Sequence, residues 1–303
     1  MAVGRFAPSP TGPLHVGNLR TALLAWLFAR SEGSRFLLRI EDLDPATSSV
    51  EHEAGQLSDL RALGLDWDGV SRQSERRPAH EAAIEELVRR DLTFPCFCSR
   101  REVREASAAP HALPGAYPGT CRGLRPDQVA QRSADGRPAA LRLRATGEDV
   151  TIVDQLHGSL TRPARDIVLR RNDGVPAYHV AVVVDDDDQG VEEVVRADDL
   201  LDATPSQAHL LDLLGRPRPS WAHVPLVVGP DGHRLAKRHG AVTLADLAAD
   251  GVSVDEVRSR LATSLGLVES GELVTMPALL ERFDPAAVPT QPWVLEPRIE
   301  RSP

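Results

Sequence analysis

Eleven residues near the N-terminus combine the residue types that a nucleotide-binding turn needs. Residues 8–18 read PSPTGPLHVGN, with His15 between Gly12 and Gly17. Glycines let the backbone approach a phosphate, and the free N–H groups at the start of a following helix favour negative charge. An imidazole beside such a turn adds a hydrogen-bonding group. The stretch is therefore a candidate site for the phosphates of a nucleotide.

A single lysine marks a second candidate phosphate contact. Of the 35 lysine and arginine residues, 34 are arginine, and the one lysine, Lys237, lies in residues 232–238, GHRLAKR. An ammonium group is a compact donor, whereas a guanidinium is a planar fork. Because the chain uses arginine everywhere else, its one lysine indicates a position that needs an ammonium group.

The three cysteines are candidate metal ligands. Cys96 and Cys98 are one residue apart, and Cys121 follows. Their odd number and spacing suit a metal site or free thiols better than a disulfide framework. Zinc prefers four thiolate or imidazole ligands in a tetrahedron, so one position stays open. By residue type alone, His111 is the first candidate for it, and the alternative for the whole group is three buried or free thiols.

The elements that must position these residues follow the pattern of a parallel α/β sheet. Strand, loop, helix and strand in succession are the opening of such a sheet. Periodicity and turn residues predict strands at 3–7, 36–40, 166–170 and 178–184, a loop at 8–13, and helices at 18–29, 48–63 and 79–91.

Composition divides the chain into four segments. Residues 92–145 crowd proline, glycine, cysteine and arginine between short strands, which predicts an inserted subdomain. It would separate the two halves of the catalytic domain at 1–91 and 146–240. Residues 241–303, which begin with an amphipathic stretch near 244–265, are predicted to form a short helical appendage.

The overall composition is that of an ordinary globular protein. With 303 residues, 42% of them hydrophobic, the chain can bury a full core, and no apolar run approaches the roughly 20 residues that span a bilayer. The N-terminus lacks the features of a secretory signal, so we expect a cytoplasmic protein. A net charge of −9 argues against nonspecific coating of nucleic acid. The acidic run at 185–188 is expected to be a solvated turn.

The two phosphate-contact segments resemble known signatures. Residues 8–18 resemble the HIGH signature of class I aminoacyl-tRNA synthetases in its glutamyl and glutaminyl form, and residues 232–238 resemble KMSKS. The resemblance covers about residues 3–245 and implies a Rossmann-like domain with His15 and Lys237 as catalytic residues. The implied ATP contacts are His15, Gly17, Asn18, Arg234 and Lys237. Arg234 replaces the first signature lysine and Ala236 the serine, which leaves the dynamics of this loop open.

The same resemblance implies a glutamate pocket. Bound glutamate needs an anion near its α-ammonium group and a cation near its side-chain carboxylate. Glu41 would supply the first, and either Arg5 or Arg196 the second. The implied glutamate-binding residues are Arg5, Phe6, Ala7, Pro8, Ser9, Glu41, Tyr178 and Arg196.

Two further features resemble the glutamyl-queuosine tRNA(Asp) synthetase family. They are Cys-x-Cys followed by Tyr-x3-Cys, and the 66 residues (303 − 237) after Lys237, too few for a large anticodon-binding domain. This resemblance implies Tyr117 as fourth ligand of a structural zinc ion. It also implies that ATP, with Mg²⁺, activates glutamate without tRNA, and that the glutamyl group passes to queuosine at the wobble position of tRNA(Asp). We expect a monomer without membrane contact.

Three other functions remain as alternatives. A minimal glutamyl-tRNA synthetase would charge an acceptor 3′ end. A catalytically inactive paralogue would bind glutamate, zinc or tRNA as a sensor, although His15 and Lys237 weigh against it. A nucleotidyltransferase that makes a dinucleotide is disfavoured by the residues of the glutamate pocket.

Overall fold

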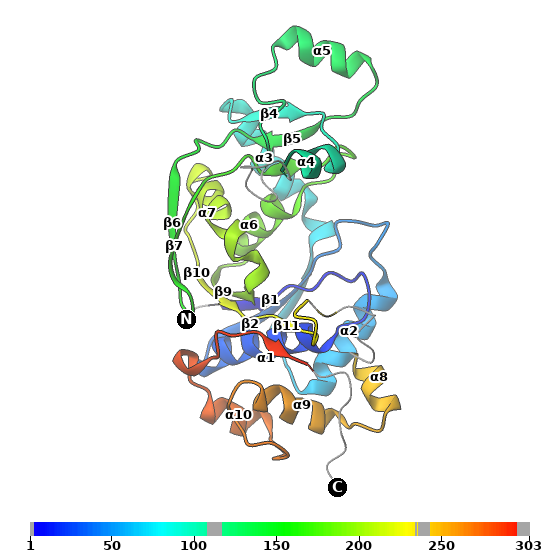
Figure 1. Cartoon of the computed structure of the whole chain (residues 1–303), viewed down its shortest axis with the longest axis vertical. Coiled ribbons are helices and arrows are strands. Elements are labelled where there is room, and N and C mark those ends of the chain that lie inside the picture. The colour runs from blue at the N-terminus through cyan, green and yellow to red at the C-terminus, as the bar shows by residue number, and fades with distance from the viewer. Residues whose placement is uncertain (1–2, 108–116, 234, 236–242, 296–303) are drawn as a thin grey trace.

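The computed structural model describes residues 3–107, 117–233, 235 and 243–295. Figure 1 shows an elongated molecule with a large sheet at its centre, a small sheet at one end and helices α8, α9 and α10 at the other. Among the described residues, no helix combines the length and the apolar character that crossing a bilayer requires.

The large sheet has seven strands in the order β3-β2-β1-β9-β10-β6-β7. Neighbouring strands run parallel as far as β6, and β7 closes one edge as an antiparallel hairpin. This arrangement confirms the predicted Rossmann-like α/β architecture. The strands are β1 (Val3–Phe6), β2 (Arg35–Ile40), β3 (Gly69–Arg72), β6 (Asp149–Asp154), β7 (Gly158–Pro163), β9 (Val191–Ala197) and β10 (Ser220–Val224).

Helices cover both faces of this sheet and give each its own apolar core. One core joins α1 and α2 to the C-terminal helices, and the other joins α3, α6 and α7. The main helices are α1 (Val16–Ser31), α2 (Val50–Leu63), α3 (Arg77–Arg89), α6 (Tyr178–Asp188) and α7 (Thr204–Leu213). Short 3-10 helices η1 (Gln73–Arg76) and η2 (Asp198–Ala203) precede α3 and α7. The helices predicted at 18–29, 48–63 and 79–91 are confirmed as α1, α2 and α3.

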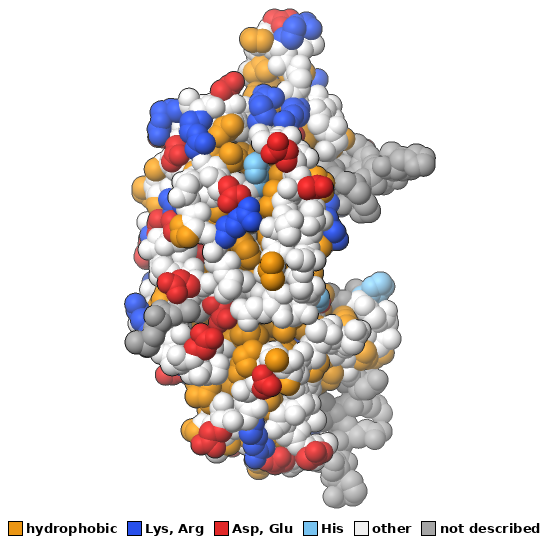
Figure 2. Space-filling model, turned by 90° about the vertical axis from the view of Figure 1, so that its left-hand side faces the viewer, with side chains coloured by type: hydrophobic (Ala, Val, Ile, Leu, Met, Phe, Trp, Pro, Cys, Tyr) orange, Lys and Arg blue, Asp and Glu red, His pale blue; other side chains and the backbone are white. Residues whose placement is uncertain are grey.

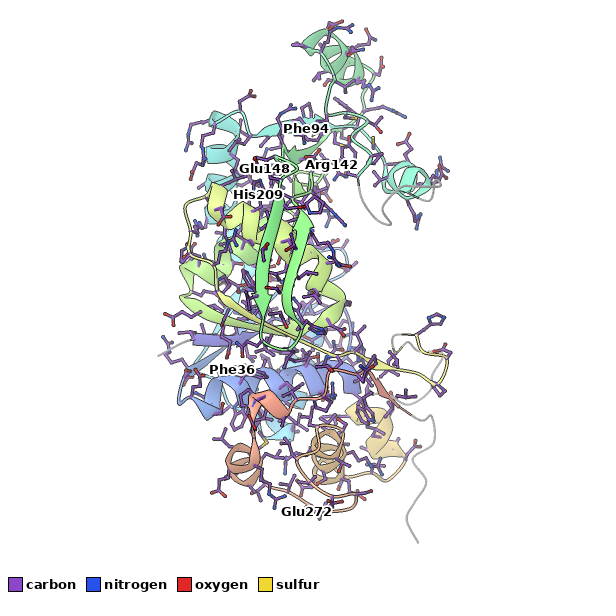
Figure 3. All side chains as sticks on the ribbon, turned by 60° about the vertical axis from the view of Figure 1, so that its left-hand side comes forward. Phe36, Phe94, Arg142, Glu148, His209 and Glu272 are labelled. Atoms are coloured by element: carbon purple, nitrogen blue, oxygen red, sulfur yellow. The ribbon has the colours of Figure 1, made fainter. Side chains whose placement is uncertain are left out.

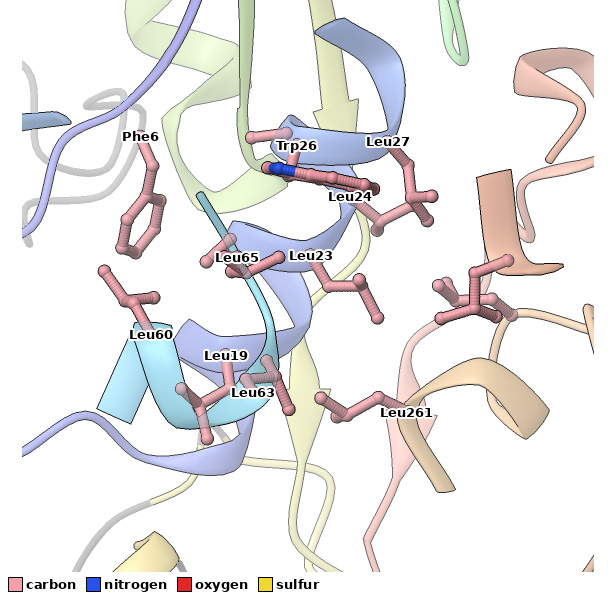
Figure 4. Close-up of a cluster of buried hydrophobic side chains, with 14 of the residues drawn as sticks. Phe6, Leu19, Leu23, Leu24, Trp26, Leu27, Leu60, Leu63, Leu65 and Leu261 are labelled. Atoms are coloured by element: carbon pink, nitrogen blue, oxygen red, sulfur yellow. The ribbon is translucent and has the colours of Figure 1, made fainter. Parts of the chain in front are cut away.

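Helix α1 lies at the centre of the molecule. Its leucines meet Leu60 and Leu63 of α2 and Leu261 of α9 in one cluster (Figure 4). Gly4 of β1 lets the helix lie directly on the sheet, because a Cβ there would stand 2.9 Å from the Cβ of Ala29. Helix α1, whose N-cap is His15, is consequently held in place by packing on two of its sides.

The C-terminal segment forms α8 (Leu244–Ala249), α9 (Val254–Thr263), α10 (Met276–Arg282), η4 (Pro285–Ala287) and the strand β12 (Trp293–Val294). The amphipathic stretch near 244–265 is two helices, because Gly251 adopts a positive φ of 79° and Ser253 caps a new helix. Strand β12 pairs in parallel with β11 (Val227–Val228).

A second, three-stranded sheet forms the end of the molecule opposite the C-terminal helices. Its order is β4-β5-β8, and a small cluster around Phe94, Phe97, Cys96 and Cys121 packs against it. The elements are β4 (Thr93–Cys96), α4 (Arg100–Ser107), α5 (Pro126–Ala134), β5 (Ala140–Leu143) and β8 (Val168–Arg170). Strand β8 shows that this sheet also draws on residues beyond 92–145.

Two sequence predictions about residues 178–188 were wrong. Residues 178–184 form the first part of helix α6, where a strand was predicted. An unbroken apolar run fits a buried helix as well as a buried strand, and α6 is buried between the sheet and its neighbouring helices. The acidic run at 185–188 is not a solvated turn, since Asp185 is fully buried and Asp186 is only 7% exposed.

Asp186 neutralises two buried arginines. Its Oδ1 atom accepts hydrogen bonds from Nη1 of Arg39 at 2.6 Å and from Nε of Arg5 at 3.2 Å. Burial alone would raise the pKa of Asp186, but these two guanidinium groups hold it below its ordinary value. Removing one member of a buried ion pair leaves an uncompensated charge, which costs about 3–5 kcal/mol.

Asp186→Asn should therefore lower the free energy of unfolding by about 3–5 kcal/mol. Asp188→Asn is the matched control, because Asp188 is 32% exposed and its pairs with Arg76 and Arg216 lie near the surface. Such pairs contribute about 0–1 kcal/mol. Urea unfolding of the two variants measures the difference, and equal losses would refute the role given to Asp186.

Candidate active site

A cavity of about 560 Å³ lies where β1, β2 and β9 end. In parallel α/β sheets, ligands bind beyond the carboxyl ends of the strands. The cavity is lined by ten of the residues that the sequence singles out, namely Arg5, Phe6, Ala7, Pro8, Ser9, His15, Asn18, Glu41, Tyr178 and Arg196. The fold thus brings the proposed nucleotide turn and the proposed amino-acid pocket into one space.

His15 occupies the N-cap of α1 at one wall of this cavity. Its Nδ1 accepts a hydrogen bond from the backbone N–H of Asn18 at 3.2 Å, and the Asn18 side chain accepts one from the backbone N–H of His15. With Nδ1 used as an acceptor, the neutral ring carries its hydrogen on Nε2. The cap therefore fixes an imidazole with a donor nitrogen at the start of a helix, where an anion is favoured.

Gly17 lies directly against the His15 ring. A Cβ at this position would stand 3.0 Å from Cε1 and Nδ1 of the ring. It would also approach the Cβ of Val227 to 3.4 Å. A side chain here would therefore push the imidazole away from the helix start, which explains glycine within the first turn of α1.

Lys237 and Arg234 lie outside the described residues, but strand β11 before them and Thr243 after them are described. Strand β11 precedes the segment, and its Val227 lies beside Gly17. Thr243, which follows the segment, forms an antiparallel bridge with His15. The described residues that flank the lysine segment, Val227 and Thr243, therefore lie next to Gly17 and His15 of the first signature.

Glu41, whose side chain is 12% exposed, follows strand β2. Its backbone N–H donates to the carbonyl of Pro8 at 2.9 Å, which ties it to the signature loop. Burial raises the pKa of Glu41 to about 7, against the opposing effect of Arg39 and Arg5. Arg39 is 3.9 Å away at its nearest nitrogen. A cationic group that entered the cavity beside Glu41 would stabilise its ionised form.

Arg196 is a buried cation near the end of β9, 6% exposed. Its guanidinium donates hydrogen bonds to neutral partners, which are His223, Thr204, Gln207 and, at 3.4 Å, Tyr178. Within the described part of the chain it forms no ion pair. Burial lowers the pKa of Arg196, and this incomplete compensation favours an anionic ligand in the cavity.

Arg5 differs from Arg196 in its partners. Its Nε donates to Asp186, and its Nη1 donates to the carbonyl of Val195 at 3.0 Å. Asp186 therefore already offsets its charge. The sequence left both arginines as candidates for an anionic ligand, and the structure places both on the cavity wall.

Gln56 is a cavity residue that the sequence analysis missed. Its Nε2 donates to the carbonyls of Ser9 at 3.0 Å and Gly12 at 2.7 Å, so it holds the proline-rich loop in place. The available signal was its position, because Gln56 shares the buried face of α2 with Leu60 and Leu63. A polar residue on an apolar helical face indicates a specific hydrogen-bond partner.

The three cysteine sulfurs lie within 4.8 Å of one another. Tetrahedral zinc with Zn–S bonds of about 2.3 Å places its sulfur ligands about 3.8 Å apart, and the Sγ atoms of Cys98 and Cys121 are 3.6 Å apart. The donor set and its spacing therefore fit a structural zinc ion.

Tyr117 lies beside these cysteines, whereas His111 lies outside the described residues. The Tyr117 hydroxyl accepts a hydrogen bond from the backbone N–H of Cys121 at 2.7 Å. Burial alone would raise the pKa of the Cys96 thiol, but hydrogen bonds from Tyr117 and Arg142 hold it below its ordinary value. The Tyr117 oxygen is thus within reach of a metal held by the sulfurs.

Comparison with known proteins places the chain among tRNA synthetases. The family described as "tRNA synthetases class I (E and Q), catalytic domain" matches residues 1–295. Proteins named Glutamyl-Q tRNA(Asp) synthetase are similar to this chain. The one from Nocardia farcinica is 58% identical over 96% of this chain and 92% of its own length. The one from Symbiobacterium thermophilum is 47% identical over 96% of this chain and 95% of its own.

A solved structure is also similar. It is a glutamate tRNA ligase from Elizabethkingia meningosepticum in complex with its amino acid, with a TM-score of 0.81 and 27% identity. The match covers 95% of this chain and 66% of that chain, so this chain spans slightly less than two thirds of the solved ligase.

The cysteine cluster predicts about one zinc ion per chain in the purified protein. Cys98→Ala should lose most of this zinc and make the segment around 96–121 sensitive to proteolysis, because the metal joins its two ends. Ser133→Ala, an exposed change in α5, is the matched control and should retain the metal. Elemental analysis checks both, and a zinc-free unmutated protein would contradict the assignment.

Proposed function

The chain belongs to the class I tRNA synthetase family of the glutamyl and glutaminyl branch, and we propose that it uses ATP to activate glutamate and passes the glutamyl group to a tRNA. The observation that carries this proposal is the single cavity that contains His15, Glu41 and Arg196. It provides a helix start for phosphate, a carboxylate for an ammonium group and a cation for a second carboxylate. Acidic amino acids have the charges that match this set, and the similarity to proteins of the glutamyl and glutaminyl branch favours glutamate.

The charges of the pocket orient the substrate. Glu41 receives the α-ammonium group, and Arg196 receives the side-chain carboxylate because none of its described hydrogen-bond partners is anionic. Arg5, which is partly neutralised by Asp186, supports Arg196 from the adjacent strand. The α-carboxylate then points toward the His15 side of the cavity, where the nucleotide phosphates bind.

Adenylate formation is a direct displacement at phosphorus. An α-carboxylate oxygen of glutamate attacks the α-phosphorus of ATP, the bond to the bridging oxygen breaks, and pyrophosphate leaves. His15, Gly17 and Asn18 contact the phosphates from the start of α1, and Arg234 and Lys237 contact them from the second signature. Mg²⁺, held mostly by phosphate oxygens and water, offsets their charge. The gain in rate comes from cations placed where negative charge develops.

The second half of the reaction transfers the glutamyl group. A hydroxyl of the acceptor attacks the carbonyl carbon of the adenylate, loses its proton, and AMP leaves. We propose that activation needs no tRNA and that the acceptor is queuosine at the wobble position of tRNA(Asp). The relatives named Glutamyl-Q tRNA(Asp) synthetase support this choice.

Positive charge is concentrated where a tRNA could bind. Residues 92–145 contain nine arginines against four acidic residues, in a chain whose net charge is −9. In Figure 2, basic side chains gather toward the end that carries the small sheet, and acidic side chains predominate over the other half. Such a local basic surface offers phosphate contacts on an acidic protein. A structural zinc ion held by Cys96, Cys98, Cys121 and Tyr117 would stabilise it.

A glutamyl-tRNA synthetase that charges the acceptor 3′ end is the second candidate, favoured by the similar glutamate tRNA ligase structure. The test is glutamate-dependent exchange of pyrophosphate into ATP without tRNA, followed by transfer of labelled glutamate to tRNA(Asp) with and without queuosine. Exchange without tRNA and queuosine-dependent transfer are expected. Exchange that requires tRNA(Glu) would favour the second candidate, and no exchange would overturn the proposed activity.

Glutamate binding should weaken as the pH falls below about 7. The α-ammonium group binds ionised Glu41, whose pKa is raised to about 7 in the free protein. Below that pH a proton must leave on binding, so the affinity should fall up to about tenfold per pH unit, and it should be nearly constant above pH 8. Calorimetric titration from pH 5.5 to 8.5 checks this. Glu41→Gln should bind weakly without the pH dependence, and a flat profile for the unmutated protein would argue against Glu41.

Gly17→Ala should slow pyrophosphate exchange by about tenfold or more, because the new Cβ displaces the His15 ring. The net change in stability should stay within about 1 kcal/mol, because the gain in helix propensity from alanine offsets the weakened His15 cap. Gly55→Ala in α2, where a Cβ meets nothing within 4 Å, is the matched control and should keep full activity. Exchange rates and thermal melts are compared, and equal rates for the two variants would refute the steric role of Gly17.

A further inference from the structure

One of the residues that orient the Arg196 guanidinium is a histidine outside the cavity lining. His223 lies on β10, is fully buried, and stands directly opposite Arg196 in the parallel register of β9 and β10. Its Nε2 atom is 3.0 Å from Nε of Arg196. Because an arginine Nε–H can only donate, His223 Nε2 must accept this hydrogen bond.

Asp154 on the next strand, β6, determines that tautomer of His223. Its Oδ2 atom is 2.6 Å from Nδ1 of His223 and also accepts the backbone N–H of His223 at 3.1 Å. A carboxylate only accepts, so the ring hydrogen lies on Nδ1 and the lone pair on Nε2. The other oxygen of Asp154 accepts the backbone N–H groups of Leu156 and His157, each at 3.0 Å, which holds the carboxylate in place.

The remaining contacts of Arg196 are neutral as well. Its Nη2 donates to Thr204 Oγ1 at 2.8 Å and to Gln207 Oε1 at 2.6 Å, both from α7. Neutral acceptors fix the guanidinium plane without cancelling its charge. Arg5 shows the alternative, because Asp186 bonds it directly. His223 thus lies between the Asp154 carboxylate and Arg196. Asp154 orients the His223 ring, and the ring in turn orients the Arg196 guanidinium.

We propose that Asp154 and His223 are positioning residues that present the Arg196 guanidinium, as a charge without a bonded counter-anion, to the side-chain carboxylate of the amino-acid substrate. The inference rests on the proposed function, which supplies glutamate as that substrate. Arg196, His223 and Asp154 lie on the adjacent strands β9, β10 and β6, in that order. The order of the strands in the sheet therefore brings the three side chains together. Neither Asp154 nor His223 lines the cavity.

The consequence is a defect confined to the amino acid. His223→Met fills similar space but offers Arg196 only a weak sulfur acceptor, so the guanidinium loses one of the hydrogen bonds that fix its direction. The Michaelis constant for glutamate should rise about 10- to 100-fold, the range expected when a buried donor loses its partner. The constant for ATP should change less than threefold. His223→Gln, whose amide carries one donor and one acceptor, should recover most of the loss.

His209→Met is the matched control, because it also removes a buried histidine. His209 lies on α7, does not line the cavity, and has no hydrogen-bond partner at Nε2 within the described residues. Figure 3 places it near Glu148, toward the small sheet. Its Michaelis constants for glutamate and ATP should match those of the unmutated protein.

The experiment measures pyrophosphate exchange against glutamate and ATP concentration for the unmutated protein and the three variants, with thermal melts of each. A rise confined to glutamate in His223→Met, with recovery in His223→Gln, supports the inference. An unchanged constant for glutamate, equal changes for both substrates, or no recovery would overturn it. If the unmutated protein shows no glutamate-dependent exchange, the proposed function itself is wrong. If exchange is present but the glutamate constant of His223→Met does not change, only the inference about Asp154 and His223 is wrong.

Discussion

A buried guanidinium without a bonded counter-anion is the constraint on which the rest of this site depends. Arg196 has been moved out of water, and its described hydrogen-bond partners, on β10, α6 and α7, are neutral. Burying a charge in this way is costly unless an opposite charge joins it. The substrate carboxylate would be that charge, so part of the binding free energy of the substrate comes from completing an ion pair that the fold leaves open.

The sheet order explains how distant parts of the sequence meet at this charge. Strands β1 and β9 are neighbours, which brings Arg5 beside Arg196, and β2 on the other side of β1 delivers Glu41. Helix α1 begins at the same edge with His15 as its cap, held against the sheet by the core around its leucines. The parallel direction of these strands therefore places the phosphate turn and both amino-acid contacts in one cavity.

Local patterns in the sequence were sufficient for the first half of the sheet. The strand, proline-rich loop, helix and strand between residues 3 and 40 carry clear turn residues and helical spacing, and the structure confirms them. The prediction failed at residues 178–188, because an unbroken apolar run has no period and because the burial of Asp186 depends on Arg5 and Arg39, which lie far away in the sequence. Asp154 and His223 were missed for the same reason, since 69 residues separate them. The cavity gathers ten predicted site residues, while the roles given to them remain predictions, and Lys237 lies outside the described residues.

A crystal structure of the protein with a nonhydrolysable analogue of glutamyl adenylate would test the proposed site directly. We expect the side-chain carboxylate of the analogue to accept hydrogen bonds from Arg196, its ammonium group to lie against Glu41, and its phosphate-like group to lie at the start of α1 beside His15. A side-chain carboxylate bound away from Arg196, or an ammonium group that does not contact Glu41, would contradict the proposed site.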